Sequence, residues 1–148
     1  MDQYASGRHK RVSAKAIIRT EDGHILIVKD HWKDYWSFPG GIVEANESPF
    51  EGVQREVLEE TSLTPEWVGF LGSSYRRDEK KESLNFTFGA SMSRTDVEEN
   101  FKAADGEGEA WKLVTPEEAM TLLEKPTAGN LPQFLARWEN CSLLIEAL

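Results

Sequence analysis

Apolar residues fall into short clusters that turn residues separate along most of the chain. Residues 12–20 (VSAKAIIRT) and 24–29 (HILIVK) are rich in β-branched and apolar side chains, and the Asp-Gly pair at 22–23 between them is a hairpin signal. Residues 35–38 (YWSF) predict a short strand that ends at the Pro-Gly-Gly sequence of 39–41. Three more segments predict strands, the first two of them paired: 67–75, 83–92 and 110–114.

Helical signals follow the Pro-Gly-Gly sequence. Ser48 and Glu51 form an S-x-x-E capping box with proline at the first helical position, and apolar residues recur behind it at helical spacing. Residues 115–118 (TPEE) open a second helix in the same way, 131–139 predicts a final helix, and 96–109 is expected to be an acidic loop. Because strands and helices intermix without strict alternation, we expect an α/β (α+β) fold with helices on both faces of a mixed sheet. The predicted core face of the first helix consists of Phe50, Val53 and Val57.

Length and composition bound the class of protein. The chain of 148 residues suits one domain, 1–148, and 39% hydrophobic with 29% charged residues is typical of soluble globular proteins. We find no apolar run long enough to cross a membrane and no secretory signal at the N-terminus. The lone Cys141 excludes an internal disulfide and favours a cytoplasmic location, with a small packing residue preferred over a reactive thiol.

The charge is acidic, with 17 Lys and Arg against 26 Asp and Glu, a net charge of −9. Sequence-independent nucleic-acid binding needs a basic surface, so we expect no stable nucleic-acid binding and consider RNA-end processing disfavoured. An acidic protein still binds phosphates when metal ions mediate, because a bound cation inverts the local charge.

Three glutamates converge on one face of the first predicted helix. At about 100° per residue, Glu59 and Glu60 lie on either side of Glu56, within one stripe about 100° wide. Surface helices are often acidic, but here we expect the preceding Pro-Gly-Gly turn to bring backbone carbonyls to the same place. Carboxylate and carbonyl oxygens suit Mg²⁺ or Mn²⁺, and the absence of Cys and His from residues 40–63 argues against zinc. Gly52, one turn before Glu56, is interpreted as leaving space for a bulky ligand.

Residues 41–63 resemble the Nudix box, G-x5-E-x7-R-E-U-x-E-E-x-G-U, where U is aliphatic. Every fixed position matches except the last glycine, which is Ser62. A serine in the left-handed conformation that this position usually has costs about 1 kcal/mol, and it removes no carboxylate. The matching residues are Gly41, Glu47, Arg55, Glu56, Val57, Glu59, Glu60 and Leu63.

The resemblance implies a Nudix-type α/β/α sandwich and a MutT-like hydrolase that cleaves a nucleoside diphosphate linked to another moiety. It implies Mg²⁺ or Mn²⁺ as cofactor, with the Gly40 carbonyl and the carboxylates of Glu56, Glu59 and Glu60 as ligands. Arg55 would form a supporting salt bridge with Glu47. Without metal, repulsion between the carboxylates should raise at least one of their pKa values.

The general base and the substrate contacts stay open at this stage. The base is Glu60 or a glutamate of the sequence DGEGEAW, Glu107 or Glu109, which is otherwise a plain acidic loop. Trp32 lies in a polar segment and is the preferred residue for stacking on a base, whereas Phe86 and Phe88 are expected in the core. A group of basic residues either binds a terminal phosphate or is a solvent-exposed part of a hairpin turn. The group consists of Arg76, Arg77, Lys80 and Lys81.

Several substrates and two other classes of protein remain. One of these classes is an acidic interaction module, which metal binding would distinguish from the other two. A nucleotide sugar, ADP-ribose and a (d)NTP all fit a small nucleotide substrate. The alternative is a catalytically silent Nudix-like nucleotide sensor, which is disfavoured because all the box carboxylates are retained. The apolar C-terminal sequence CSLLIEAL predicts either a packed tail or a homodimer contact.

Overall fold

The computed structural model describes residues 9–30, 33–103 and 110–141. Six strands form one sheet: β1 (Arg11–Arg19), β2 (Ile25–Lys29), β3 (Gly40–Ile42), β4 (Glu66–Arg77), β5 (Glu82–Ser91) and β6 (Ala110–Val114). Their order is β4-β5-β1-β2-β6, and β3 pairs with β1 off this path. The sheet is mixed because β1 runs parallel to β5 and antiparallel to β2 and β3.

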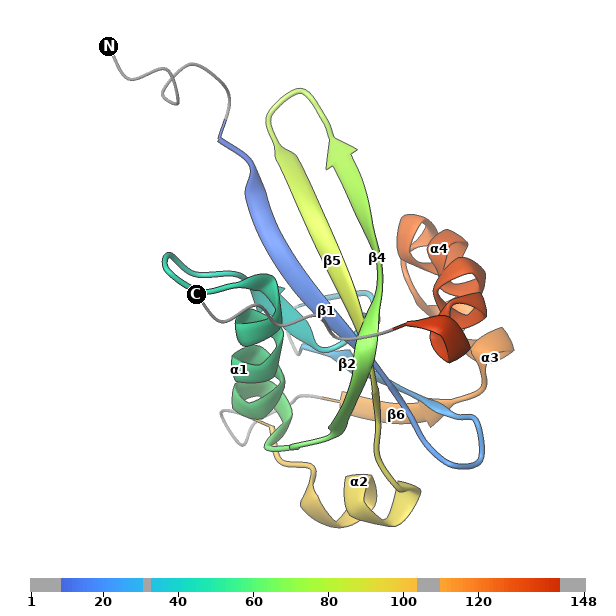
Figure 1. The fold of residues 1–148 in the computed structure, drawn as a ribbon. Coiled ribbons are helices and arrows are strands. Elements are labelled where there is room, and N and C mark those ends of the chain that lie inside the picture. Colours follow the sequence, from blue (N-terminus) through green and yellow to red (C-terminus); the bar gives the residue numbers. More distant parts are fainter. Residues whose placement is uncertain (1–8, 31–32, 104–109, 142–148) are drawn as a thin grey trace.

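Helices cover both faces of the sheet. They are α1 (Pro49–Thr61), α2 (Arg94–Asn100), α3 (Pro116–Leu122) and α4 (Lys125–Ala136), followed by a 3₁₀ turn at Trp138–Asn140. Figure 1 shows α1 on one side of the sheet, α3 and α4 on the other, and α2 at one end. Within the described ranges, no helix is long and apolar enough to cross a membrane. The expected α/β/α sandwich with a mixed sheet is confirmed.

The alternation of side chains along β1 explains the two helical layers. Ala16 and Ile18 point to the side of α1, where they join a core cluster with Val57, while Ile17 points to the other side and joins a cluster with Leu131 of α4. All five side chains are completely buried. Since successive residues of a strand face opposite sides, one apolar strand supplies two cores.

Most predicted elements are confirmed, including the first hairpin, the β4–β5 pair, the strand at 110–114 and both capping boxes. The predicted strand at 35–38 is wrong, because only isolated bridges form there, between Val28 and Ser37 and between Trp36 and Leu123. The strand lies instead at Gly40–Ile42, where two glycines pair with β1. Strand propensity did not indicate it because the pairing is decided by a distant partner.

Two helix boundaries also differ from the expectation. The segment expected as an acidic loop at 96–109 begins with α2, whose N-terminus is capped by the Ser93 hydroxyl accepting from the Asp96 amide at 3.0 Å. With seven residues and Val97 as its one buried side chain, α2 carries too little apolar periodicity to be recognised. The final helix begins at Lys125 rather than 131, because Pro126 in its first turn starts the helix instead of ending it.

Candidate functional site

The capping box fixes the start of α1. The Ser48 hydroxyl accepts from the Glu51 amide at 3.1 Å, and the Ser48 amide donates to the Glu51 carboxylate at 3.1 Å. Val53 and Val57 are completely buried against the sheet. Because these contacts fix the rotation of the helix, the neighbouring stripe with Glu56 and Glu60 lies beside β3.

The two glycines of β3 leave room for this helix face. Gly40 has φ +145°, and a Cβ there would lie 2.2 Å from the Ala14 carbonyl oxygen of β1. At Gly41 a Cβ would lie 2.6 Å from the carboxylate carbon of Glu56. Gly40 therefore permits the close approach of β3 to β1, whereas the absence of a side chain at Gly41 leaves room for the Glu56 carboxylate.

Glu60 is the most deeply placed carboxylate of the stripe. Its Oε2 accepts a hydrogen bond from the Gly40 amide at 3.1 Å. Burial raises the pKa of Glu60 to about 7, Glu56 and Asp30 add to the rise, and the Gly40 amide and Lys15 oppose it. The expected raised pKa is therefore present, but its main cause is desolvation rather than repulsion between carboxylates.

The predicted salt bridge between Arg55 and Glu47 is confirmed. Arg55 donates from Nε at 3.0 Å and from Nη2 at 2.9 Å to the two oxygens of Glu47, and Nη2 also donates to the Ile42 carbonyl at 3.1 Å. These hydrogen bonds lower the pKa of Glu47 to about 2 and raise the pKa of Arg55. The pair ties the segment before α1 to the helix.

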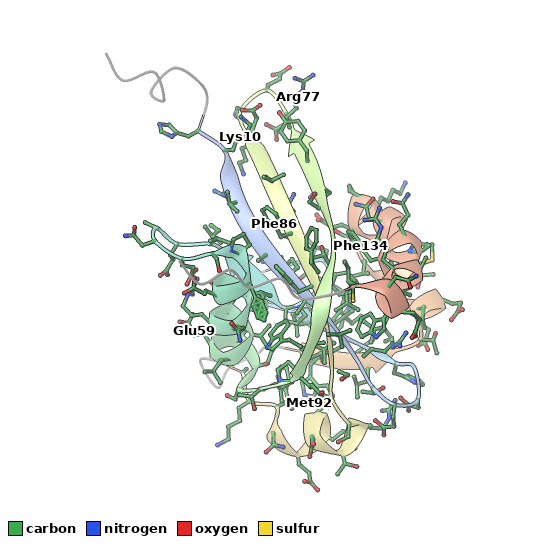
Figure 2. All side chains as sticks on the ribbon, in the orientation of Figure 1. Lys10, Glu59, Arg77, Phe86, Met92 and Phe134 are labelled. Carbon is green, nitrogen blue, oxygen red and sulfur yellow. The ribbon has the colours of Figure 1, made fainter. Side chains whose placement is uncertain are left out.

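Arg55 also holds the remaining two carboxylates. Its Nη1 lies 3.1 Å from Glu56 Oε1 and 3.1 Å from Glu59 Oε2. Two of the predicted carboxylate ligands, Glu56 and Glu60, therefore lie against β3. Glu59 lies on the exposed side of α1 (Figure 2). In the portion of the chain that the structure describes, however, no three carboxylate, His or Cys side chains converge closely enough to hold a metal ion as they lie.

Lys15 joins this group from β1, and sequence reasoning missed it. Its Nζ donates to the Gly40 carbonyl at 3.4 Å, and its charge interacts with Glu60 and Glu56. Burial lowers the pKa of Lys15 while these carboxylates oppose the shift. The alternation of polar Ser13 and Lys15 with apolar neighbours in the sequence was the signal that could have indicated it.

The interpretation of Gly52 is wrong. This glycine is buried, and a Cβ there would lie 3.0 Å from Glu47 Oε1 and 3.2 Å from a methyl group of Val43. It therefore makes room for the chain segment that precedes α1, and the space beside it is already filled by protein atoms.

Comparison with known proteins places this arrangement in a family. A sequence model of the NUDIX domain matches residues 9–138. The chain belongs to the NUDIX domain family. A curated relative, an RNA pyrophosphohydrolase of Halorhodospira halophila, is 41% identical over 66 residues, which are 45% of this chain and 36% of that protein. The alignment thus spans about a third of the length of this relative.

Solved structures share the fold of this Nudix domain. The MutT protein from Methanosarcina mazei superposes with a TM-score of 0.73 at 24% identity, covering 88% of this chain and 98% of that one. The NUDIX domain of Shewanella oneidensis NrtR, solved with ADP ribose, gives a TM-score of 0.72 at 19% identity, with 93% of each chain covered. At these identities the likeness establishes the fold alone.

The Nudix box departs from its pattern only at Ser62, and the structure shows how the serine is accommodated. Ser62 caps α1 in the left-handed conformation, with φ 63° and ψ 12°, and its amide donates to the Leu58 carbonyl at 2.9 Å. Its hydroxyl donates to the Lys102 carbonyl at 3.3 Å. The substitution therefore changes a helix cap and leaves the carboxylates in place.

A polar groove of about 930 Å³ opens beside Lys15 on the sheet face that α4 flanks. Its floor comes from β1, β5 and β4, and one wall comes from α4. Arg76, predicted to bind substrate, lies in this groove, as does the aromatic side chain of Tyr35. Sequence reasoning missed the uncharged polar floor, which consists of Ser13, Ser74, Ser83, Asn85 and Thr87.

The remaining predicted residues divide into two groups. Phe88 is buried and Phe86 packs against the same core cluster, so the expectation that both are core residues is confirmed. Trp32, Glu107 and Glu109 lie outside the described residues. Their predicted parts in stacking and in proton transfer stay predictions.

Proposed function

We propose that this chain is a divalent-metal-dependent hydrolase that cleaves the pyrophosphate bond of a nucleoside diphosphate linked to another moiety. The observation that carries the proposal is the partly buried carboxylate of Glu60, which accepts from the Gly40 amide beside Glu56. Family membership and the MutT fold neighbour support it. We further propose that residues 1–148 act as one domain.

The donor set fits a hard divalent cation. Glu56, Glu59, Glu60 and the Gly40 carbonyl offer oxygen atoms only, and Mg²⁺ and Mn²⁺ prefer such ligands. Burial of Glu60 without a full positive counter-charge raises its pKa to about 7, and a bound cation would remove that cost. Arg55 contacts one oxygen of Glu56 and one oxygen of Glu59, and each carboxylate has a second oxygen with which it can bind the ion.

Each part of the chain then has a defined task. When bound, Mg²⁺ or Mn²⁺ neutralises phosphate charge and lowers the pKa of a water molecule. Gly40 and Gly41 keep the carboxylates close to β3, and the Arg55–Glu47 ion pair orients Glu56 and Glu59 without contact to substrate. Lys15 lines the groove and supplies positive charge at its carboxylate end.

Glu60 is the candidate general base within the described residues. A carboxylate with a pKa near 7 accepts a proton efficiently at neutral pH. A carboxylate that coordinates metal stays charged, so Glu60 serves either as ligand or as base, and Glu107 and Glu109 remain the other candidates for the base. The pH dependence of kcat/KM in Glu109→Gln and Glu107→Gln variants separates these assignments.

Hydrolysis of a panel of nucleotides and nucleotide sugars tests the proposal. Wild type, Glu60→Gln and the control Glu99→Gln would be assayed with millimolar Mg²⁺ or Mn²⁺, with released phosphate measured after phosphatase treatment. Glu99 is an exposed carboxylate on α2 and serves as a matched loss of one charge. We expect turnover of one substrate class, retained in Glu99→Gln and reduced on the order of 10²- to 10⁴-fold in Glu60→Gln.

Two results would count against the proposal. Turnover that is independent of divalent metal would show that the carboxylates do not act as metal ligands in the reaction. Binding of a nucleotide without any turnover would instead support the nucleotide-sensor alternative.

A further inference from the structure

The groove floor consists of three cross-strand rows on the face that α4 flanks. Going outward from the carboxylates, the rows are Lys15–Thr87–Gly72, Ser13–Asn85–Ser74 and Arg11–Ser83–Arg76. Residues paired across neighbouring strands point to the same face of a sheet. The next residue inward on β1, Ile17, belongs to the apolar core, so the polar stretch has a sharp inner boundary.

The two ends of this floor are cationic and its middle is neutral. Lys15 contributes the inner charge, and Arg11 and Arg76 contribute the outer charge. Lys15 lies four positions after Arg11 on β1, which is about 13 Å of extended strand. In the middle row, Ser13 donates to Asn85, whose amide also donates to Ser83 at 3.4 Å. The floor therefore offers hydrogen bonds between two positive ends.

The residues that line the groove carry a net positive charge, although the chain as a whole is acidic. Six Lys or Arg and three Asp or Glu line it, a formal surplus of three positive charges in a chain of net charge −9. Arg76 is only loosely paired, with Nη1 at 3.9 Å from Glu124 Oε2. Figure 2 shows Arg77, another lining residue, near the tip of the β4–β5 hairpin. Asp78 and Glu82 line the groove at the same end, and Glu82 is the cross-strand partner of Arg77, so Arg11 and Arg76 are the cations that face the floor there.

We propose that the groove binds a nucleotide with a second phosphoryl group on its 3′ side. The 5′ pyrophosphate lies toward Lys15 and the carboxylates, the nucleoside lies over the row of Ser13 and Asn85, and the 3′ phosphate is bound by Arg11 and Arg76. This inference rests on the proposed function for the position of the pyrophosphate. A mononucleotide with a 3′ phosphate and a 5′-triphosphorylated RNA share this chemistry.

The test compares kcat/KM for ATP and for adenosine 3′-phosphate 5′-triphosphate. We expect the 3′ phosphate to raise kcat/KM at least about tenfold, because a charge-assisted hydrogen bond contributes that much. In the double variant Arg11→Gln/Arg76→Gln this ratio should fall to near one. The control Lys102→Gln removes an exposed charge outside the groove lining and should keep the ratio.

A third compound, 5′-triphosphorylated diadenylate, separates the two sources of the second phosphate. Faster turnover of the dinucleotide than of the 3′-phosphorylated mononucleotide assigns the groove to RNA ends, and equal or slower turnover assigns it to mononucleotides. A wild-type ratio near one overturns the inference, as does a ratio that the double variant leaves unchanged.

A binding measurement keeps the inference separate from the proposed function. If no compound is hydrolysed, calorimetry with AMP and adenosine 3′,5′-bisphosphate replaces the kinetic assay. Binding of the bisphosphate at least about tenfold more tightly, lost in Arg11→Gln/Arg76→Gln, supports the second phosphate site without catalysis. Equal affinity for the two compounds overturns it.

Discussion

The carboxylate face and the polar groove meet at Lys15, but the chain builds them in different ways. The carboxylates and the glycines that seat them lie within residues 40–60, on α1 and β3. The groove floor combines β1 with β4 and β5, which are distant in sequence. The positions of the carboxylates depend on the spacing of residues along one short segment, whereas the positions of the groove residues depend on the register between strands. Substitutions should therefore act on single contacts in the first region and on several strands in the second.

The adjacent glycines of β3 provide the largest contrast. Gly40→Ala would place a Cβ 2.2 Å from the Ala14 carbonyl oxygen at φ +145°, so we expect a loss of roughly 3 kcal/mol or more in the free energy of unfolding. In Gly41→Ala the three atoms nearest to the new Cβ all belong to the flexible carboxylate of Glu56, so we expect a fold of nearly unchanged stability and a kcat/KM lower on the order of 10²-fold.

Urea titration and steady-state kinetics on both variants check this contrast. Gly129→Ala is the matched control, because a Cβ at that helical position meets nothing within 4 Å and alanine favours a helix. Equal activity of Gly41→Ala and wild type would show that the position of Glu56 does not limit the reaction.

The variant Arg55→Lys tests how the carboxylate face is held in position. Lysine keeps one positive charge but cannot donate to both oxygens of Glu47 while also holding Glu56 and Glu59. We expect kcat/KM to fall about 10- to 100-fold, as when an orienting partner of a metal ligand is removed, with a smaller change in KM for the nucleotide. A change confined to nucleotide KM would instead mean that Arg55 contacts substrate.

The raised pKa of Glu60 predicts an unusual pH dependence for the metal-free protein. The folded state binds this proton up to about pH 7, whereas the unfolded state releases it near 4.5, so stability falls as pH rises between these values. Glu60→Gln should therefore stabilise the metal-free protein by roughly 2–3 kcal/mol more at pH 8 than at pH 4.5. Urea titrations of both proteins with chelator present measure this difference.

The cap of α1 gives the smallest expected effect. Ser62→Gly removes the cost of a left-handed serine, at φ 63°, and loses one long hydrogen bond to Lys102. We expect a gain of about 0.5–1 kcal/mol in the free energy of unfolding, measured by urea titration, with kcat/KM unchanged. A large change in activity would show that this turn influences the carboxylates.

Local signals predicted much of the fold and one side of the site. The capping box at Ser48 fixed the start of α1, and the helical spacing put Glu56, Glu59 and Glu60 on one stripe. The Gly-Gly strand was missed because its pairing partner on β1 lies about 25 residues away. Propensity carries no information about such a partner.

The groove was missed for a related reason. The net charge averages over the whole surface, so it indicated no basic face, although cationic residues gather along β1 and the β4–β5 hairpin. Arg11 and Arg76 become neighbours only through Ser83 of β5, and strand register fixes that contact. The role of Gly52 was misjudged because the segment that fills the space beside it precedes the helix.

Binding of Mn²⁺ to the purified protein tests the assignment of the carboxylate face most directly. Calorimetric titrations would compare wild type, Glu60→Gln and the exposed control Glu99→Gln at pH 7.5. We expect Mn²⁺ binding in wild type and Glu99→Gln, and an affinity at least about tenfold weaker in Glu60→Gln. Equal affinity in all three proteins would contradict the assignment, because the Glu60 carboxylate, which accepts from the Gly40 amide, would then hold no metal.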